Sequence, residues 1–317
     1  MINMKNWLQA GKAALLGGML AVGLILPGTA FAASKADLQY VQEVCQQYQQ
    51  QKSGNMTVHL TFLSSFAKAD GNIVFQGAQQ PTLLLKGTAD GTYTLVFGTT
   101  KSASIPFYLE QSEKNILVYY KQTKEWQKAE IPFSAQEYAK LMQQDVDMQD
   151  VKDVKVIADN ATERTLQITL AKESIIKDIR AGMGKQEAVP ANLSPDKKKK
   201  WQNEQKQQQV MIDKICDSIQ DYNLTWVVDK STRQLKRESM DLTPILRASA
   251  GGALAAAKDQ LKPAQQEVLQ RMIDSCSLQF DVVNQPTATA EKVVIPENVK
   301  KAKLVKPSAN DVVNIKL

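Results

Sequence analysis

The sequence predicts an α+β protein built around an antiparallel sheet. In several short segments apolar and polar side chains alternate with the two-residue period of a half-buried strand. Residues 57–62 are an example, because Val58, Leu60 and Phe62 share one face. Turn residues separate these segments at intervals of roughly 10 to 15 residues, which favours an antiparallel meander over a parallel sheet. Blocks with helical spacing lie between the strand sets, so helices and strands are grouped rather than strictly alternating.

The composition excludes several kinds of catalytic site. The chain has 317 residues with 39 Lys and Arg, 33 Asp and Glu, one histidine and three cysteines. A single histidine cannot supply a His-rich zinc site, and three cysteines cannot form a four-cysteine cluster. Hydrophobic residues make up 43% and charged residues 23% of the chain, which is typical of a globular protein. We therefore expect neither a metal nor a cofactor.

Residues 1–32 have the pattern of a secretory signal peptide. Lys5 and Lys12 precede an apolar run over 13–26, and Ala30-Phe31-Ala32 offers small residues for cleavage. The run is about 14 residues long, short of the roughly 20 that a membrane-spanning anchor needs. No cysteine follows to carry a lipid anchor. We expect cleavage near Ala32 and an extracytoplasmic protein, either periplasmic or secreted.

The charge of the remaining chain does not favour nucleic acid as a partner. Residues 1–32 contain two lysines and no acids, so the rest carries 39 − 2 = 37 basic and 33 acidic residues, a net charge of +4. The dense basic run is Lys197 to Lys200, followed by Trp201. Lysines attract anionic headgroups and tryptophan suits a membrane interface, so we expect these five residues to dock on an anionic surface. A solvated helix start is the alternative.

The first half of the chain begins with a helix and continues with strands. Ser34 and Asp37 form the two ends of a capping box that opens a helix running to about Lys52. His59 lies on the polar face of the strand that follows, and Asp70-Gly71 and Asp90-Gly91 are interpreted as turns. The other strands predicted here are 81–86, 93–97, 105–110 and 115–121.

The second half alternates helical blocks with strand pairs. A second capping box, Ser134 with Glu137, opens a helix through about Asp147. Further helices are predicted at 172–179, broken at Gly182 and Gly184, after Ser194-Pro195, and on either side of Pro263. Strands are predicted at 151–157, 165–170, 223–228, 234–242, 277–283 and 290–295. We see no linker and expect one domain over 33–300, with helical insertions at about 173–220 and 246–276 and a loose tail at 301–317.

Motifs for enzymatic chemistry are weak. Ser65 with Lys68 and Ser194 with Lys197 match a Ser-x-x-Lys pattern, but the companion motifs of acyl-transferring enzymes are missing. A serine triad would need His59, which we expect to be solvated. The carboxylates Asp145 and Asp147 lie at a polar helix end. We therefore predict a protein that is not an enzyme.

The three cysteines leave two alternatives open. Cys45 falls on the apolar face of the first helix, which favours packing there. Cys216 and Cys276 lie late in helical stripes and are the pair most suited to a disulfide in an oxidising compartment. The other alternative is three unpaired thiols.

Four features stand out in the order of these elements: the aromatic strands of 115–128 ending near Trp126, the hairpin of 226–235, Met240-Asp-Leu-Thr243, and 284–297 with Asn284-Gln-Pro and Val-Ile-Pro-Glu. In this order the chain resembles the LolA/LppX group, which are extracytoplasmic carriers of lipids or lipoproteins together with secreted bacterial relatives of unassigned function. The resemblance implies a strongly curved, incompletely closed antiparallel sheet that wraps helices around an apolar cavity. The helical blocks here are longer than a minimal carrier needs.

A cavity of this kind would lie on the concave face of the sheet. We predict that Phe62, Leu95, Phe97 and Trp226 face it and bind a lipid or acylated ligand, while the small-residue helix 251–257 approaches closely and leaves room. The alternative is a filled core, in which case the protein would be a cell-envelope interaction or sensor module working through its surface.

Overall fold

A single twelve-stranded sheet organises the chain in the computed structural model. The structure describes residues 34–305 except 52, 79–81, 96–97, 99, 123, 144–149, 184–193, 258–260 and 288–291. The strands are β1 (Ser53–Leu63), β2 (Ala67–Ala78), β3 (Leu84–Leu95), β4 (Thr100–Gln111), β5 (Ile116–Gln122), β6 (Glu125–Ile131), β7 (Val151–Asp159), β8 (Glu163–Leu170), β9 (Tyr222–Asp229), β10 (Leu235–Asp241), β11 (Ser277–Pro286) and β12 (Lys303–Leu304). The helices are α2 (Lys35–Gln50), α3 (Ala135–Gln143), α4 (Lys172–Met183), α5 (Pro195–Ser218), α6 (Thr243–Ala256), α7 (Pro263–Ser275) and α8 (Glu297–Lys300).

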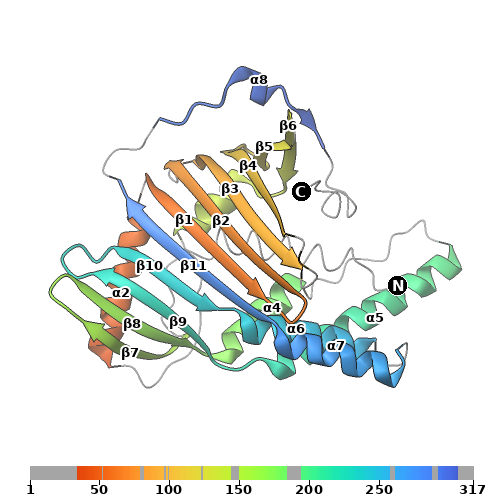
Figure 1. The fold of residues 1–317 in the computed structure, drawn as a ribbon. Coiled ribbons are helices and arrows are strands. Elements are labelled where there is room, and N and C mark those ends of the chain that lie inside the picture. The colour runs from red at the N-terminus through yellow and green to blue at the C-terminus, as the bar shows by residue number, and fades with distance from the viewer. Residues whose placement is uncertain are drawn as a thin grey trace.

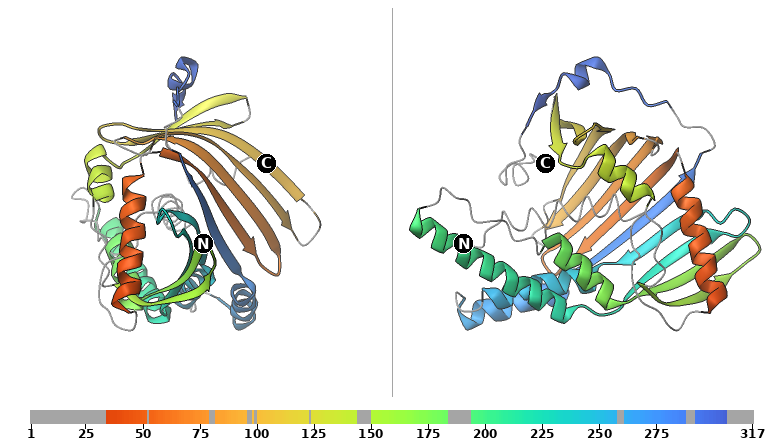
Figure 2. Two further views of the ribbon diagram at one scale, coloured as in Figure 1. Left: turned by 90° about the vertical axis from the view of Figure 1, so that its left-hand side faces the viewer. Right: turned by 180° about the vertical axis from the view of Figure 1, so that it is seen from behind.

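The sheet is antiparallel and strongly curved, which confirms the predicted fold class. Its strand order is β12-β6-β5-β4-β3-β2-β1-β11-β10-β9-β8-β7, and only the short β12 pairs in parallel, with β6, among the described strands. β11 returns late in the chain to pair with β1 in the middle of the sheet. The sheet bends so that β7 to β10 form a hooked end, while α2 and α3 lie on its open, concave side (Figures 1 and 2).

Two predicted turns are wrong: β2, which contains the first of them, was not predicted as a strand, and β3, which contains the second, was expected as two separate strands. Asp70-Gly71 and Asp90-Gly91 lie inside β2 and β3, where Gly71 pairs directly with Gly91. Segments 81–86 and 93–97 were therefore expected as separate strands, whereas Leu84 to Leu95 is continuous. Sheet neighbours on both sides occupy the backbone groups that a turn would have left free, so pairing overrides the local turn preference of these dipeptides.

Capping hydrogen bonds confirm the predicted N-terminal ends of two helices, α2 and α3. The Ser34 hydroxyl accepts from the Asp37 amide at 3.1 Å and begins α2. In α3 the Glu137 amide donates to the Ser134 hydroxyl, and the Glu137 carboxylate accepts from the Ser134 amide, which completes a capping box. Ser194 precedes α5 as predicted, but its hydroxyl makes no capping hydrogen bond. The rest of the helix expected through Asp147 lies outside the described residues.

The C-terminal segment differs from the prediction. A strand was expected over 290–295, but its described residues, 292–295, have no regular secondary structure, and α8 and β12 follow. Val293, Ile295 and Val299 are buried, and the last two pack with Tyr119 of β5 on the face of the sheet away from α2. The segment over 292–305 is therefore held on the sheet by apolar contacts and by the parallel pairing of β12 with β6, and not by the predicted strand at 290–295.

The main core lies between α2 and the concave face of the sheet. Tyr40, Val41 and Val44 of α2 belong to one buried cluster with side chains from β1 to β4 and from β7 to β11. The hairpin turn before β10 holds this helix, because Arg233 pairs with Glu43 at 3.1 Å and stacks 4.4 Å from the Tyr40 ring. Arg233 adopts a positive φ of 61° in making these contacts.

The remaining helices form a second cluster beside the sheet. Ile215 and Ile219, at the end of α5, pack with Ala248 of α6. A side chain at Gly252 would meet Ile215 at 3.0 Å, so the small residues of α6 let it approach α5. The small residues of α6 therefore serve its contact with α5, which does not support the prediction that they leave room for a ligand over the sheet. The first half of α5 extends away from the sheet (Figure 1). No helix in the described part of the chain combines the length and apolarity that crossing a membrane requires.

Candidate functional site

The concave face of the sheet is filled at one end and open at the other. Register places Met56, Phe75, Gly87 and Phe107 in one row across β1 to β4, and the three large side chains are buried. Four residues farther along β1, a second row on the same face runs across β1 to β4 through Leu60, Gly71, Gly91 and Ala103. Leu60 is 40% exposed although it lies on the same face as Met56. The helices therefore cover the first row and leave the second uncovered by described residues.

The glycines distinguish the filled row from the open row. A Cβ added at Gly87 would lie 2.6 Å from the Phe107 ring and 2.9 Å from Phe75, because these side chains occupy the space above it. A Cβ at Gly91 would meet only the Asp70 carbonyl oxygen, at 3.8 Å. At Gly71 the nearest atoms belong to Leu60, at 3.7 Å and beyond. Glycine in a strand often marks a place where a ligand approaches the backbone closely.

Apolar side chains border this open row, and together they form what we call the trough. Its residues alternate along four neighbouring strands with the same facing as Gly71 and Gly91. Leu60 and Leu95 are each 40% exposed, and the larger of the others are half-buried. The trough consists of Leu60, Phe62, Ala69, Gly71, Gly91, Tyr93, Leu95, Ala103 and Ile105.

The structure brings two of the four predicted ligand-binding residues together. Phe62 and Leu95 both lie in the trough, on β1 and β3. Phe97 lies outside the described residues. Trp226 is on the same face of the sheet but is only 7% exposed and belongs to the core under α2. A ligand in the trough would contact Phe62 and Leu95 without reaching Trp226 unless α2 moved.

A buried carboxyl group lies beside Trp226. Glu238 of β10 is 3% exposed and pairs across the sheet with Trp226 and Val282. Desolvation raises the pKa of Glu238 to about 7. The Trp226 indole opposes this rise in pKa, although its N–H has no hydrogen bond of normal geometry. Burial and then the charge of Glu238 raise the pKa of Cys45 on α2 to about 12, so this thiol stays protonated.

The residues predicted for surface docking lie in the projecting half of α5. Lys198 and Lys199 are exposed and Trp201 is half-buried. The side chains of Lys197 and Lys200 are outside the described set, although both residues belong to the helix. The five residues therefore share the first two turns of one helix.

The groups considered for covalent chemistry are separated in the structure. His59 is exposed on β1, as predicted. Ser65 follows β1, where its hydroxyl accepts from Ser275 at 3.0 Å, and Lys68 pairs with Asp70. Within the described residues no group of three or more His, Cys, Asp or Glu side chains could hold a metal ion. Asp145 and Asp147 lie outside these residues.

The cysteines are unpaired. Cys45, Cys216 and Cys276 are all free thiols, so the alternative of a disulfide between Cys216 and Cys276 is not realised in this structure. The thiol of Cys276 donates to the Met272 carbonyl oxygen one helical turn earlier, at 3.2 Å. Cys216 is buried among the helices beside the sheet.

Comparisons with known proteins give limited information. No protein-family model matches the chain, and no curated protein matches its sequence. Among solved structures, LprF from Mycobacterium bovis aligns over 84% of this chain and 99% of that chain, with 11% identity and a TM-score of 0.37. A likeness of this degree carries no conclusion about function, so the functional argument rests on the chain itself.

Sequence reasoning missed two features of this region. Gly71 and Gly91 were assigned to turns, and their pairing became visible only with the register of β2 and β3. Glu238 lies in the polar run Lys236-Arg-Glu-Ser239, which gave no sign of burial. A register shift between Leu235 and Arg237 places Glu238 on the same face as buried Leu235 and Met240.

Proposed function

We propose that the protein is a non-enzymatic extracytoplasmic carrier that holds a lipid or acylated molecule in the trough. The main observation behind this proposal is the open row at Gly71 and Gly91, where apolar side chains border space that no described residue fills. Burial of an acyl chain there would remove apolar surface from water on both sides, at about 25 cal/mol per Å². The signal-peptide pattern over 1–32 and the resemblance to the LolA/LppX group support the same function.

Ligand analysis of matched variants tests the trough. The purified protein is expected to carry a stoichiometric acyl-chain ligand, detected by native mass spectrometry followed by organic extraction. Gly91→Leu places a side chain in the open row and is expected to reduce bound lipid about tenfold, because the leucine would fill the space that the acyl chain needs. Thr92→Leu is the control, because Thr92 is the next residue, exposed on the opposite face of β3.

Two outcomes would contradict the carrier. One is repeated recovery of an empty protein, even after incubation with envelope lipids. The other is full lipid loading of Gly91→Leu at wild-type thermal stability. Either would favour the alternative of an interaction or sensor module whose concave face is filled. Part of that face, the row with Met56 and Phe107, is already buried.

We also propose that α5 brings the carrier to an anionic membrane surface. The lysines of its first turns and Trp201 lie on the half of the helix that extends from the sheet (Figure 1). Each lysine near such a surface contributes about 1 kcal/mol, so two charge reversals are expected to weaken binding tenfold or more. The assay is cosedimentation with phosphatidylglycerol vesicles at low and high salt, because salt screens this attraction.

The variant for this test is Lys198→Glu with Lys199→Glu, and its matched control is Lys300→Glu with Lys301→Glu, two exposed lysines on and after α8. Equal loss in the two double variants would show that only net charge matters and would contradict a docking role for α5. The same holds if neither variant changes sedimentation.

A further inference from the structure

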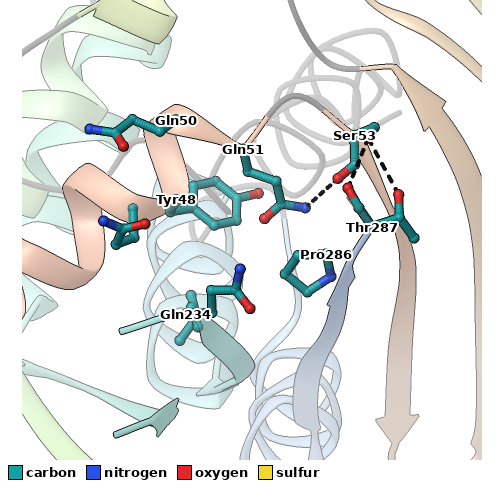
Figure 3. Close-up of a pocket in the computed structure, with 9 residues that line it drawn as sticks. Tyr48, Gln50, Gln51, Ser53, Gln234, Pro286 and Thr287 are labelled. Atoms are coloured by element: carbon teal, nitrogen blue, oxygen red, sulfur yellow. Dashed lines mark hydrogen bonds between the residues drawn. The ribbon is translucent and has the colours of Figure 1, made fainter. Parts of the chain in front are cut away.

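A second hollow lies at the other end of β1 from the trough. It has a volume of about 300 Å³ and opens where the end of α2 meets the hairpin before β10 and the end of β11 (Figure 3). This volume is at the lower end of the range for small-molecule sites. The described residues that line it are Gln47, Tyr48, Gln50, Gln51, Ser53, Gln234, Leu235, Pro286 and Thr287.

One wall of this pocket is fixed by hydrogen bonds. Gln51 and Asn284 exchange amide hydrogen bonds of 3.1 Å and 2.8 Å, and Asn284 is buried. The Gln51 amide also donates to the Ser53 carbonyl oxygen at 3.2 Å. The Ser53 hydroxyl lies 3.2 Å from the Thr287 carbonyl oxygen, to which it donates. This wall is therefore organised before any ligand binds, which lowers the entropic cost of binding.

Other polar groups around the pocket are left available. The side-chain amides of Gln47, Gln50 and Gln234 make no hydrogen bond to any described residue. Figure 3 shows the Gln234 side chain on one side of the space, with Tyr48 and Gln51 opposite. Each of these amides offers two donors and an acceptor.

The chemistry of the lining points to an uncharged ligand rich in hydroxyl groups. The nine described lining residues carry no charge, so a carboxylate or ammonium group would find amide hydrogen-bond partners among them but no opposite charge to offset its loss of water. Amide pairs match neighbouring hydroxyls, which also donate and accept. Tyr48 and Pro286 supply apolar surface for C–H groups. We propose that this pocket binds a neutral sugar, independently of any lipid in the trough.

Saturation-transfer NMR with the purified protein tests this proposal. The probes are glucose, N-acetylglucosamine and maltose, with glucuronate and glucosamine as charged counterparts. We expect transfer to at least one neutral sugar, and weaker transfer to its charged counterpart. Gln47→Ala and Gln234→Ala are each expected to raise the dissociation constant about tenfold, because each removes a hydrogen-bonding amide. Gln46→Ala is the control, since Gln46 is exposed on α2 beside the pocket but does not line it.

Three results would overturn the assignment. The first is no transfer to any of the neutral sugars. The second is binding that both lining variants leave unchanged while thermal unfolding remains normal, which would place the sugar elsewhere. The third is tighter binding of glucuronate or glucosamine than of the neutral sugars, which would exclude the neutral class. Because Gly91→Leu is expected to leave sugar binding intact, failure of the trough and failure of this pocket are distinguishable.

Discussion

Alanine at Gly87 is expected to destabilise the fold by about 3 kcal/mol, the upper part of the usual range for overpacking. The added methyl group would lie 2.4 Å from the Val74 carbonyl oxygen, 2.6 Å from the Phe107 ring and 2.9 Å from Phe75. Backbone on one side and a buried ring on the other leave no cheap direction for relaxation. Urea unfolding followed by circular dichroism measures the change, provided that the slope of the transition is unaltered.

Gly91→Ala is the matched control on the same strand and the same face. Its methyl group would enter open space, so the variant is expected to be neutral or to gain up to about 1 kcal/mol through a less flexible unfolded chain. A loss for Gly91→Ala as large as that for Gly87→Ala would mean that the trough is filled. Equal and small effects at both positions would contradict the dense packing assigned to the row at Gly87.

Glu238→Gln is expected to stabilise the protein at alkaline pH by roughly 3 kcal/mol, at 1.36 kcal/mol per pKa unit. Burial raises the pKa of Glu238 from 4.5 to about 7, so the folded state holds a proton that the unfolded state releases. The wild type therefore loses stability as pH rises from about 4.5 to about 7, and above that range the full penalty applies. Glutamine has no charge to bury and escapes this loss.

Unfolding curves at pH 5 and pH 8 separate this effect from a simple packing change. The gain from Glu238→Gln should be small at pH 5 and large at pH 8. Glu125→Gln, at an exposed position of β6, is the control for pH effects unrelated to burial. A gain at pH 8 no larger than that at pH 5 would show that Glu238 reaches water when charged, and it would argue against a sealed core beneath α2.

Local patterns predicted the elements whose signals are complete within a few residues. The capping box predicted at Ser134 is present in full, and at Ser34 the predicted N-cap is present, with the Ser34 hydroxyl accepting from the Asp37 amide, although Asp37 does not bond back to the Ser34 amide. The alternation in β9 likewise puts Trp226 and Val228 on the buried face. Signals of this kind depend on neighbours along the chain, so a single sequence is enough to read them.

The candidate site was only partly accessible in this way. Phe62 and Leu95 could be assigned to the concave face from the period of their strands, but whether that face is covered depends on where α2 and the other helices lie. A turn preference at Asp70-Gly71 and Asp90-Gly91 pointed to the wrong structure, since the dipeptides themselves carry no information about their cross-strand partners.

The sequence by itself determined that the chain builds an antiparallel α+β fold, where most of the helices and many of the strands lie, and which face of most of those strands is apolar. Only the tertiary structure decided that Gly71 meets Gly91 in open space, that Glu238 is buried, and that the end of α2 meets Pro286 at a pocket. The physical reason is that propensity and periodicity act between near neighbours. Whether a sheet face is covered by a helix, whether a carboxyl group loses its water, and whether two segments meet at a pocket all depend on groups brought together from distant parts of the chain.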